Sequence, residues 1–210
     1  MARADVATRV RGGLVGAAAG EALGLPWAGR APREISARRL YEGVGPVGAV
    51  TAALLGAGDG GPALARAVTL GWQEPAPVAR RAGGLHLGFA SVLVADLAAW
   101  ALEGRPLYQL VVDHAEDWAP PFRGVAADDR AVLDALMAVL HRHDDPGDGI
   151  RSAVRLGGAA TALLGGLTGA LLGCRYPSAV RRLAWLERVE LPGEAALEAA
   201  VTTLAASRAE

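Results

Sequence analysis

The chain has 210 residues, of which 52% are hydrophobic and 20% are charged. This length and apolar content exclude a disordered or collagen-like chain, and the single cysteine excludes a fold stapled by internal disulfides. The 21 basic residues are all arginine and are matched by 22 acidic residues, so the net charge of -1 excludes a global field that recruits nucleic acid or an anionic membrane. Because Cys174 has no disulfide partner, we expect a cytoplasmic protein.

The N-terminal half has a helical pattern broken by glycine and proline. Apolar and small residues recur at three-to-four spacing over 6–24, which predicts a helix that ends before Pro26. A short apolar segment at 50–55 is then followed by a glycine-rich loop at 56–62. Two further helices are predicted over 63–72 and 83–102.

The C-terminal half contains the most apolar part of the chain. Residues 128–141 predict an amphipathic helix with Asp129 as its N-cap or first-turn acid. A polar loop over 143–149 is expected next, followed by a helix that begins at Ile150. It leads into 156–174, which carries no formal charge.

This uncharged run has 19 residues, long enough for a membrane span, and its glycines have GxxxG spacing. Its many weakly hydrophobic Ala, Gly and Thr residues favour a central buried helix instead. The tail from Pro177 predicts two short surface helices, split at 192–193. No alternating strand pattern persists, so we expect an all-α fold with a single domain over 1–210.

Two segments resemble the ADP-ribosylglycohydrolase family. Residues 9–26 (RVRGGLVGAAAGEALGLP) are similar to its opening helix, in which a small-residue helix is followed by Gly-Asp-Ala-Leu-Gly and proline. Residues 133–186, with an Ala-rich helix, an acidic loop and a glycine-spaced apolar helix, are similar to its C-terminal half. The resemblance implies a compact orthogonal multi-helix bundle with two magnesium or manganese ions in a cleft. It also implies hydrolysis of the bond that joins ADP-ribose to a protein side chain or another group.

The sequence departs from the family where that chemistry needs carboxylates. The family's early Thr-Asp-Asp-Thr motif matches only at Thr51, and its late Gly-Gly-Asp-Thr-Asp-Thr motif reads Gly157-Gly158-Ala-Ala-Thr161. Glu21 stands where the family has aspartate in the opening helix. Hard divalent cations need oxygen ligands that alanine does not supply. We therefore predict no metal site and no cofactor, although magnesium is what the resemblance implies.

The candidate site consists of a few remaining polar residues. Glu21 is the candidate catalytic residue, because a carboxylate among small apolar residues is expected either to meet an arginine or to line a cleft. The candidate ligand-binding residues are Thr51, Asp59, Gly157, Gly158 and Thr161. For Asp59 a solvated turn former in its glycine loop is the favoured interpretation, and a displaced ligand is the alternative.

Two clusters with metal-like residues, at 112–117 and 141–148, are interpreted as solvated surface. No nucleophile elbow, phosphate loop, dinucleotide fingerprint or zinc spacing is present in the sequence.

Three functions remain open from the sequence. The first is a non-hydrolytic pseudoenzyme that binds an ADP-ribosyl-like or nucleotide ligand, or a protein partner. The second is a metal-independent hydrolase or lyase that uses Glu21 as acid or base. The third is a structural scaffold whose glycine-rich helices form a homo-oligomer.

Overall fold

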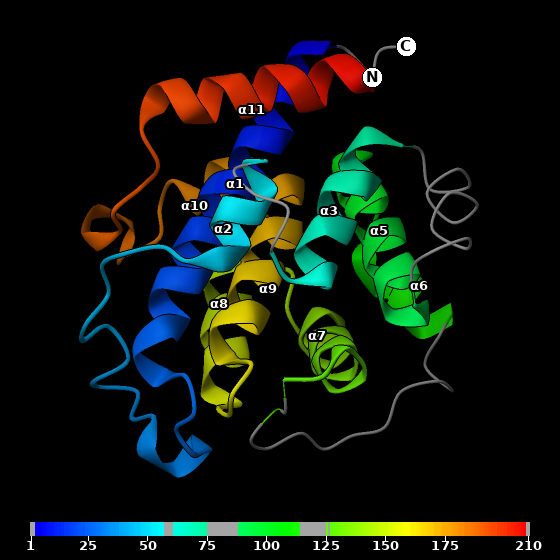
Figure 1. Cartoon of the computed structure of the whole chain (residues 1–210). Helices are drawn as coiled ribbons and strands as arrows, with labels where there is room; N and C mark the ends of the chain where they lie inside the picture. The colour runs from blue at the N-terminus through cyan, green and yellow to red at the C-terminus, as the bar shows by residue number, and fades with distance from the viewer. Residues whose placement is uncertain (1–2, 57–60, 75–87, 114–124, 126, 209–210) are drawn as a thin grey trace.

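The computed structural model describes residues 3–56, 61–74, 88–113, 125 and 127–208, and within these it is all-helical, without a strand (Figure 1). The α-helices are α1 (Arg3–Gly24), α2 (Ala49–Leu54), α3 (Ala63–Gln73), α5 (Phe89–Leu102), α6 (Leu107–Asp113), α7 (Asp129–Arg142), α8 (Pro146–Arg155), α9 (Thr161–Arg175), α10 (Pro177–Val180) and α11 (Glu194–Ser207). Short 3-10 turns are η1 (Leu25–Trp27), η2 (Pro32–Glu34) and η4 (Leu186–Arg188). The all-α prediction is confirmed.

Helices α1 and α9 form the centre of the molecule and run antiparallel. Their glycines pair in reverse order along the contact: a Cβ added at Gly12, Gly16 or Gly20 of α1 would clash with the backbone of Gly173, Gly169 or Gly165 of α9. The absence of side chains at these positions lets the two backbones touch. The glycine spacing predicted from the sequence therefore serves close packing inside the chain.

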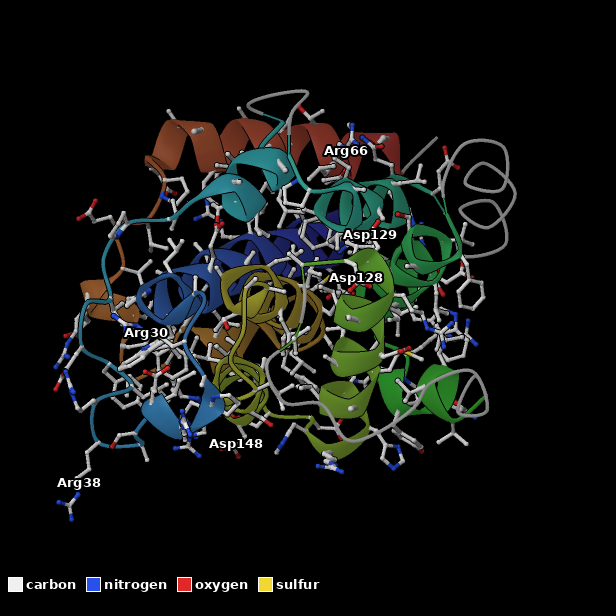
Figure 2. The ribbon with its side chains drawn as sticks, turned by 60° about the horizontal axis from the view of Figure 1, so that its bottom comes forward. Arg30, Arg38, Arg66, Asp128, Asp129 and Asp148 are labelled. Carbon is white, nitrogen blue, oxygen red and sulfur yellow. The ribbon has the colours of Figure 1, made fainter. Side chains whose placement is uncertain are left out.

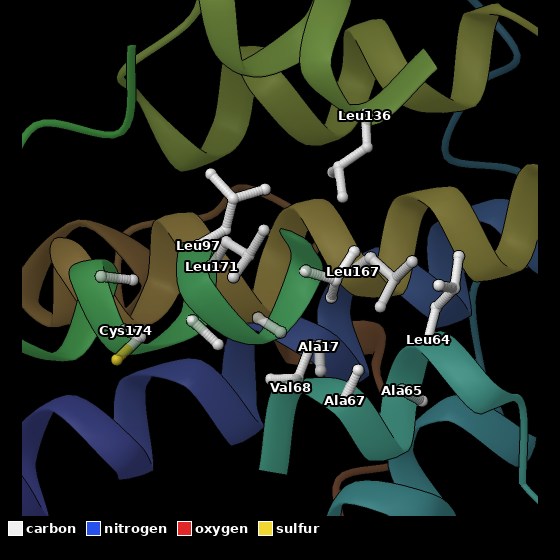
Figure 3. Close-up of a cluster of buried hydrophobic side chains, with 14 of the residues drawn as sticks. Ala17, Leu64, Ala65, Ala67, Val68, Leu97, Leu136, Leu167, Leu171 and Cys174 are labelled. Carbon is white, nitrogen blue, oxygen red and sulfur yellow. The ribbon is translucent and has the colours of Figure 1, made fainter. Parts of the chain in front are cut away.

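The main hydrophobic core fills the space between α9, α3, α5 and α7 (Figure 3). Leu167 and Leu171 of α9 lie among Val68 of α3, Leu97 of α5 and Leu136 of α7, and all five side chains are buried. Cys174 lies at the end of this cluster, and burial raises the pKa of its thiol, which keeps it protonated and unreactive.

The apolar run over 156–174 is not one continuous helix. Helix α8 ends at Arg155, and Gly157 and Gly158 follow with φ angles of +67° and +96°, in the left-handed region that favours glycine. Helix α9 then begins at Thr161, and most of its side chains are buried. The prediction of a central buried helix is confirmed, and no described helix has the length and apolarity needed to cross a membrane.

Several predicted boundaries need correction. The helix expected to begin at Ile150 begins at Pro146, because proline suits the first helical position and the Asp145 carboxylate accepts the Asp148 N–H at 3.0 Å. The helix predicted over 83–102 is observed from Phe89, because the backbone of Gly88 is extended. Residues 83–87 of that prediction lie outside the described residues. Of the two roles predicted for Asp129, it has that of the first-turn acid of α7, because the cap is Asp128, whose carboxylate accepts the Ala131 N–H at 2.9 Å; Figure 2 labels both residues.

The tail differs in part from its prediction. The break at 192–193 is observed, but α11 is a 14-residue helix with an apolar face that packs against α1 and α3. Figure 1 shows α11 lying across one end of the molecule, over the ends of α1, α2 and α3. Helix α6 was not predicted from the sequence.

Candidate functional site: a capped helix and a glycine turn

Glu21, the candidate catalytic residue, lies in the last turn of α1 and is only 2% exposed. Its Oε1 accepts the backbone N–H of Val50 at 2.8 Å. Its Oε2 accepts the backbone N–H of Thr51 at 2.9 Å and the Thr51 hydroxyl at 2.6 Å. The carboxylate therefore caps the start of α2 from another helix, where backbone N–H groups have no partner within their own helix.

The structure corrects the partner expected for Glu21. We expected a buried carboxylate at this position to meet an arginine or line a cleft, but it is satisfied by two backbone N–H groups and one hydroxyl. Gly48 precedes α2, and a Cβ there would lie 2.9 Å from Oε1. The glycine lets the chain pass close to the carboxylate. Two predicted site residues, Glu21 and Thr51, are thus in direct contact.

The second group of predicted site residues forms the turn between α8 and α9. The carbonyl oxygen of Gly158 accepts the Thr161 hydroxyl at 2.7 Å and the Gly29 N–H at 2.9 Å. The Gly158 N–H donates to the Arg30 carbonyl oxygen at 2.8 Å, and the Gly157 carbonyl oxygen accepts the Val125 N–H at 2.9 Å. These polar groups join three segments of backbone to one another.

Both groups border the same end of α1. A Cβ at Gly24, one turn after Glu21, would lie 2.8 Å from the Thr161 carbonyl oxygen. The first turn of α2 packs on α9, because a Cβ at Gly166 would lie 2.9 Å from a methyl carbon of Val50. The structure therefore gathers the predicted residues at the region where α1, α2 and α9 meet. Asp59 lies outside the described residues.

The residues gathered there do not fit the divalent cations that the family resemblance implies. Magnesium and manganese need several oxygen ligands, mostly carboxylates. Glu21 brings the only carboxylate of the predicted set that the structure describes, and both of its oxygens already accept hydrogen bonds. Across the described part of the chain, no three His, Cys, Asp or Glu residues group as a metal site.

The polar cluster at 141–148 is built as a helix start. Asp145 caps α8, and Asp148 in its first turn accepts a hydrogen bond from Arg151 at 2.5 Å. The residues ahead of it are exposed or half-buried, as interpreted from the sequence. The cluster at 112–117 lies mostly outside the described residues.

Three surface cavities are lined by residues other than Glu21 and its hydrogen-bond partners Val50 and Thr51. One, of about 150 Å³, is a polar cavity between the start of α8 and the segment after α10, and we call it the arginine cavity. It is lined by Asp145, Gly147, Arg151, Ala179, Arg182, Leu183, Ala184 and Trp185. A second, of about 240 Å³, lies between α1 and the segment 177–191, and a third, of about 490 Å³, lies beside α11.

The arginine cavity combines an aromatic wall, Trp185, which is held in place by hydrogen bonding and stacking, with the exposed guanidinium of Arg182. The buried Trp185 donates from Nε1 to the Ala19 carbonyl oxygen at 3.0 Å and stacks on Tyr41 with ring centroids 5.5 Å apart. Arg151 is held by Asp148 and by the Tyr41 hydroxyl. Arg182 is exposed and forms no ion pair with a described residue. Sequence reasoning missed this cavity, although the pair Arg181-Arg182 was a visible signal.

No protein-family model, curated protein or solved structure matches this chain.

Proposed function

We propose that this chain is a non-hydrolytic protein of the ADP-ribosylglycohydrolase type, which binds an ADP-ribosyl-like ligand or a protein partner without cleaving it. The observation that carries the proposal is the state of Glu21. Each oxygen of its carboxylate accepts a hydrogen bond from the start of α2, and Glu21 itself is only 2% exposed. Its role is therefore to hold α2 on α1.

The geometry disfavours the two alternatives for separate reasons. A general acid or base must bring an oxygen within hydrogen-bond reach of the reacting group. Glu21 is only 2% exposed, and both of its oxygens already accept hydrogen bonds from Val50 and Thr51. A homo-oligomer built on glycine faces would need those faces at the surface. The glycines of α9 instead contact α1 within the same chain.

A ligand with phosphate groups would find its best-suited donor at the arginine cavity. Guanidinium groups bind phosphate oxygens through paired N–H donors, and the exposed Arg182 has its donors available. Arg151 lines the same cavity, but its guanidinium is already engaged by Asp148 and the Tyr41 hydroxyl, and the Asp145 carboxylate would repel a phosphate. We therefore assign the phosphate to Arg182. The buried Trp185 gives the cavity a rigid wall.

The test combines binding with turnover. ADP-ribose is titrated calorimetrically into the purified protein with and without magnesium, and release of ADP-ribose from ADP-ribosyl-arginine is followed by chromatography. The proposal predicts metal-independent binding and no release. Arg182→Ala should weaken binding about tenfold, the worth of one charge-assisted hydrogen bond. Arg38→Ala is the matched control, because Arg38 is exposed and points away from the ribbon (Figure 2).

Two results count against the proposal. Magnesium-dependent release of ADP-ribose by the wild-type protein would overturn it entirely. An absence of binding heat in both conditions would overturn the ligand version and leave a protein partner as the function.

A further inference from the structure

The cavity beside α11, which we call the α11 groove, has a volume of about 490 Å³. It lies between α11 and the corner formed by α2 and α3. Figure 1 shows how these three helices are arranged. Its lining residues are Ala53, Leu54, Leu55, Gly56, Thr69, Gln73, Ala196, Ala199, Ala200, Thr203 and Leu204. Pockets of 300–1,000 Å³ are typical of small-molecule sites.

The groove is held open because α11 is tied down at both ends. Near its start, Arg11 of α1 forms ion pairs with Glu194, at 2.9 Å, and with Glu198. At its end, Arg208 pairs with Glu103 at 2.7 Å and donates to the Gly71 carbonyl oxygen at 3.4 Å. These contacts join α11 to three other parts of the chain and position it over α2 and α3.

Between these ties, α11 turns a face of small side chains toward α2 and α3. Ala196, Ala199, Ala200 and Thr203 follow the helical spacing i, i+3, i+4 and i+7, which puts them on one face. Their short side chains do not reach across to Leu54 and the other groove residues of α2 and α3. The groove is thus a consequence of small residues on a helix fixed in place.

The residues that line the groove disfavour a charged ligand. Among the described residues that line the groove, none is ionisable. The Thr69 hydroxyl donates to the Arg66 carbonyl oxygen at 2.7 Å, and the Thr203 hydroxyl donates to the Ala199 carbonyl oxygen at 2.9 Å. Gln73 is half-buried and its amide forms no hydrogen bond within the described residues. Its amide is therefore available to a ligand, while the two threonine hydroxyls are left only as acceptors.

The surroundings favour a small molecule over a protein segment. A protein interface needs roughly 800 Å² on each partner and uses large aromatic or arginine anchors. The large apolar side chains exposed in the described structure are Leu25, Phe89, Tyr108, Val112 and Leu191, and none of them lines the groove.

We propose that the α11 groove binds a small uncharged apolar ligand, with an aliphatic or aromatic body between α11 and α2–α3 and one neutral polar group hydrogen-bonded to Gln73. A charged ligand would lose its hydration in a lining that offers no opposite charge. The proposal is independent of Glu21 and of ADP-ribose, so its failure leaves the proposed function untouched.

The test uses the neutral fluorophore N-phenyl-1-naphthylamine, whose emission rises in an apolar site. We expect saturable binding by the wild-type protein, and displacement by decanol at concentrations at least tenfold below those needed with decanoate, which has the same chain length but carries a charge. Gln73→Leu should weaken displacement by decanol several-fold and leave binding of the fluorophore within about twofold. No saturable signal, or equal displacement by decanol and decanoate, would overturn the proposal.

A pair of variants on one helix locates the site. Ala199 and Ala195 are both exposed alanines of α11, but only Ala199 lines the groove. Ala199→Trp should reduce affinity for the fluorophore at least tenfold, while Ala195→Trp should leave it unchanged. Circular dichroism melting of both variants verifies that they fold. Equal binding by the two folded variants would place the fluorophore elsewhere and contradict the proposal.

Discussion

Helices α9 and α11 both carry a face of small residues at helical spacing, but the face on α9 is closely packed and the face on α11 borders a groove. On α9, the glycines at 165, 169 and 173 meet glycines of α1 and the backbones touch. On α11, the small residues at 196, 199, 200 and 203 face side chains of α2 and α3 that do not close the gap, and a groove of about 490 Å³ remains. Small residues on one helix allow close contact only when the facing helix also has small side chains at the matching positions.

The contact between α1 and α9 should be the less tolerant of the two. A Cβ at Gly169 would clash with the carbonyl group of Gly16, which is backbone and has no rotamer to change. Gly169→Ala should therefore lower the free energy of unfolding by about 3 kcal/mol or more, at the upper end for overpacked cores. Urea unfolding followed by circular dichroism measures this loss.

Gly193→Ala is the control for that variant, since nothing lies within 4 Å of the added Cβ and φ is -55°. We expect it to cost less than about 1 kcal/mol, as for a changed N-cap residue. If Gly169→Ala proved as stable as Gly193→Ala, the close contact of α1 with α9 would be wrong.

The ties at the ends of α11 sharpen the comparison, because they hold the groove in shape. Arg208 has a side chain only 10% exposed, and it links α11 to Glu103 and to the Gly71 carbonyl oxygen. Arg208→Ala should cost about 1–2 kcal/mol in urea unfolding, through lost hydrogen bonds to a largely covered guanidinium.

The matched arginine is Arg39, which pairs with Glu42 at 2.7 Å but is well exposed. Arg39→Ala should cost less than about 0.5 kcal/mol, as is usual for surface ion pairs. Equal losses for the two variants would mean that the Arg208 contacts do not hold α11.

Filling the groove should have the smallest effect on stability. Ala199→Leu adds three carbon atoms where the structure has open space, so the free energy of unfolding should stay within about 0.5 kcal/mol of the wild-type value. The same unfolding measurement checks it. A loss near that of Gly169→Ala would show that α11 packs as tightly as α9 and that no groove exists.

Local sequence patterns were enough for much of the helical structure. The three-to-four spacing predicted α1, and a short helix was predicted where α3 lies. Asp129 was predicted as the N-cap or first-turn acid of α7, and it is the first-turn acid, while Asp128 directly before it is the cap. The error at 143–149 was also local, since an Asp-Pro pair is a recognised helix start that a run of polar residues concealed.

Contacts between distant segments were beyond such patterns. Glu21 and Thr51 were each selected from the sequence, but their pairing joins positions thirty residues apart and depends on where the chain returns after η2. The α11 groove depends in the same way on the ion pairs that position α11. Small residues at helical spacing were visible in the sequence, but whether they give a close contact or a groove depends on the side chains of the facing helix.

The central claim is that Glu21 is a structural cap of α2, and a double-mutant cycle with Thr51 tests it most directly. Glu21→Gln, Thr51→Val and the double variant are unfolded in urea, with Thr51→Ser as the variant that keeps the hydroxyl. The account predicts that each single variant is destabilised and that the two positions are coupled by about 1.5–3 kcal/mol, the worth of a hydrogen bond to a buried charge. Unchanged stability in Glu21→Gln, together with zero coupling, would show that the carboxylate is not engaged by α2 and would contradict the account.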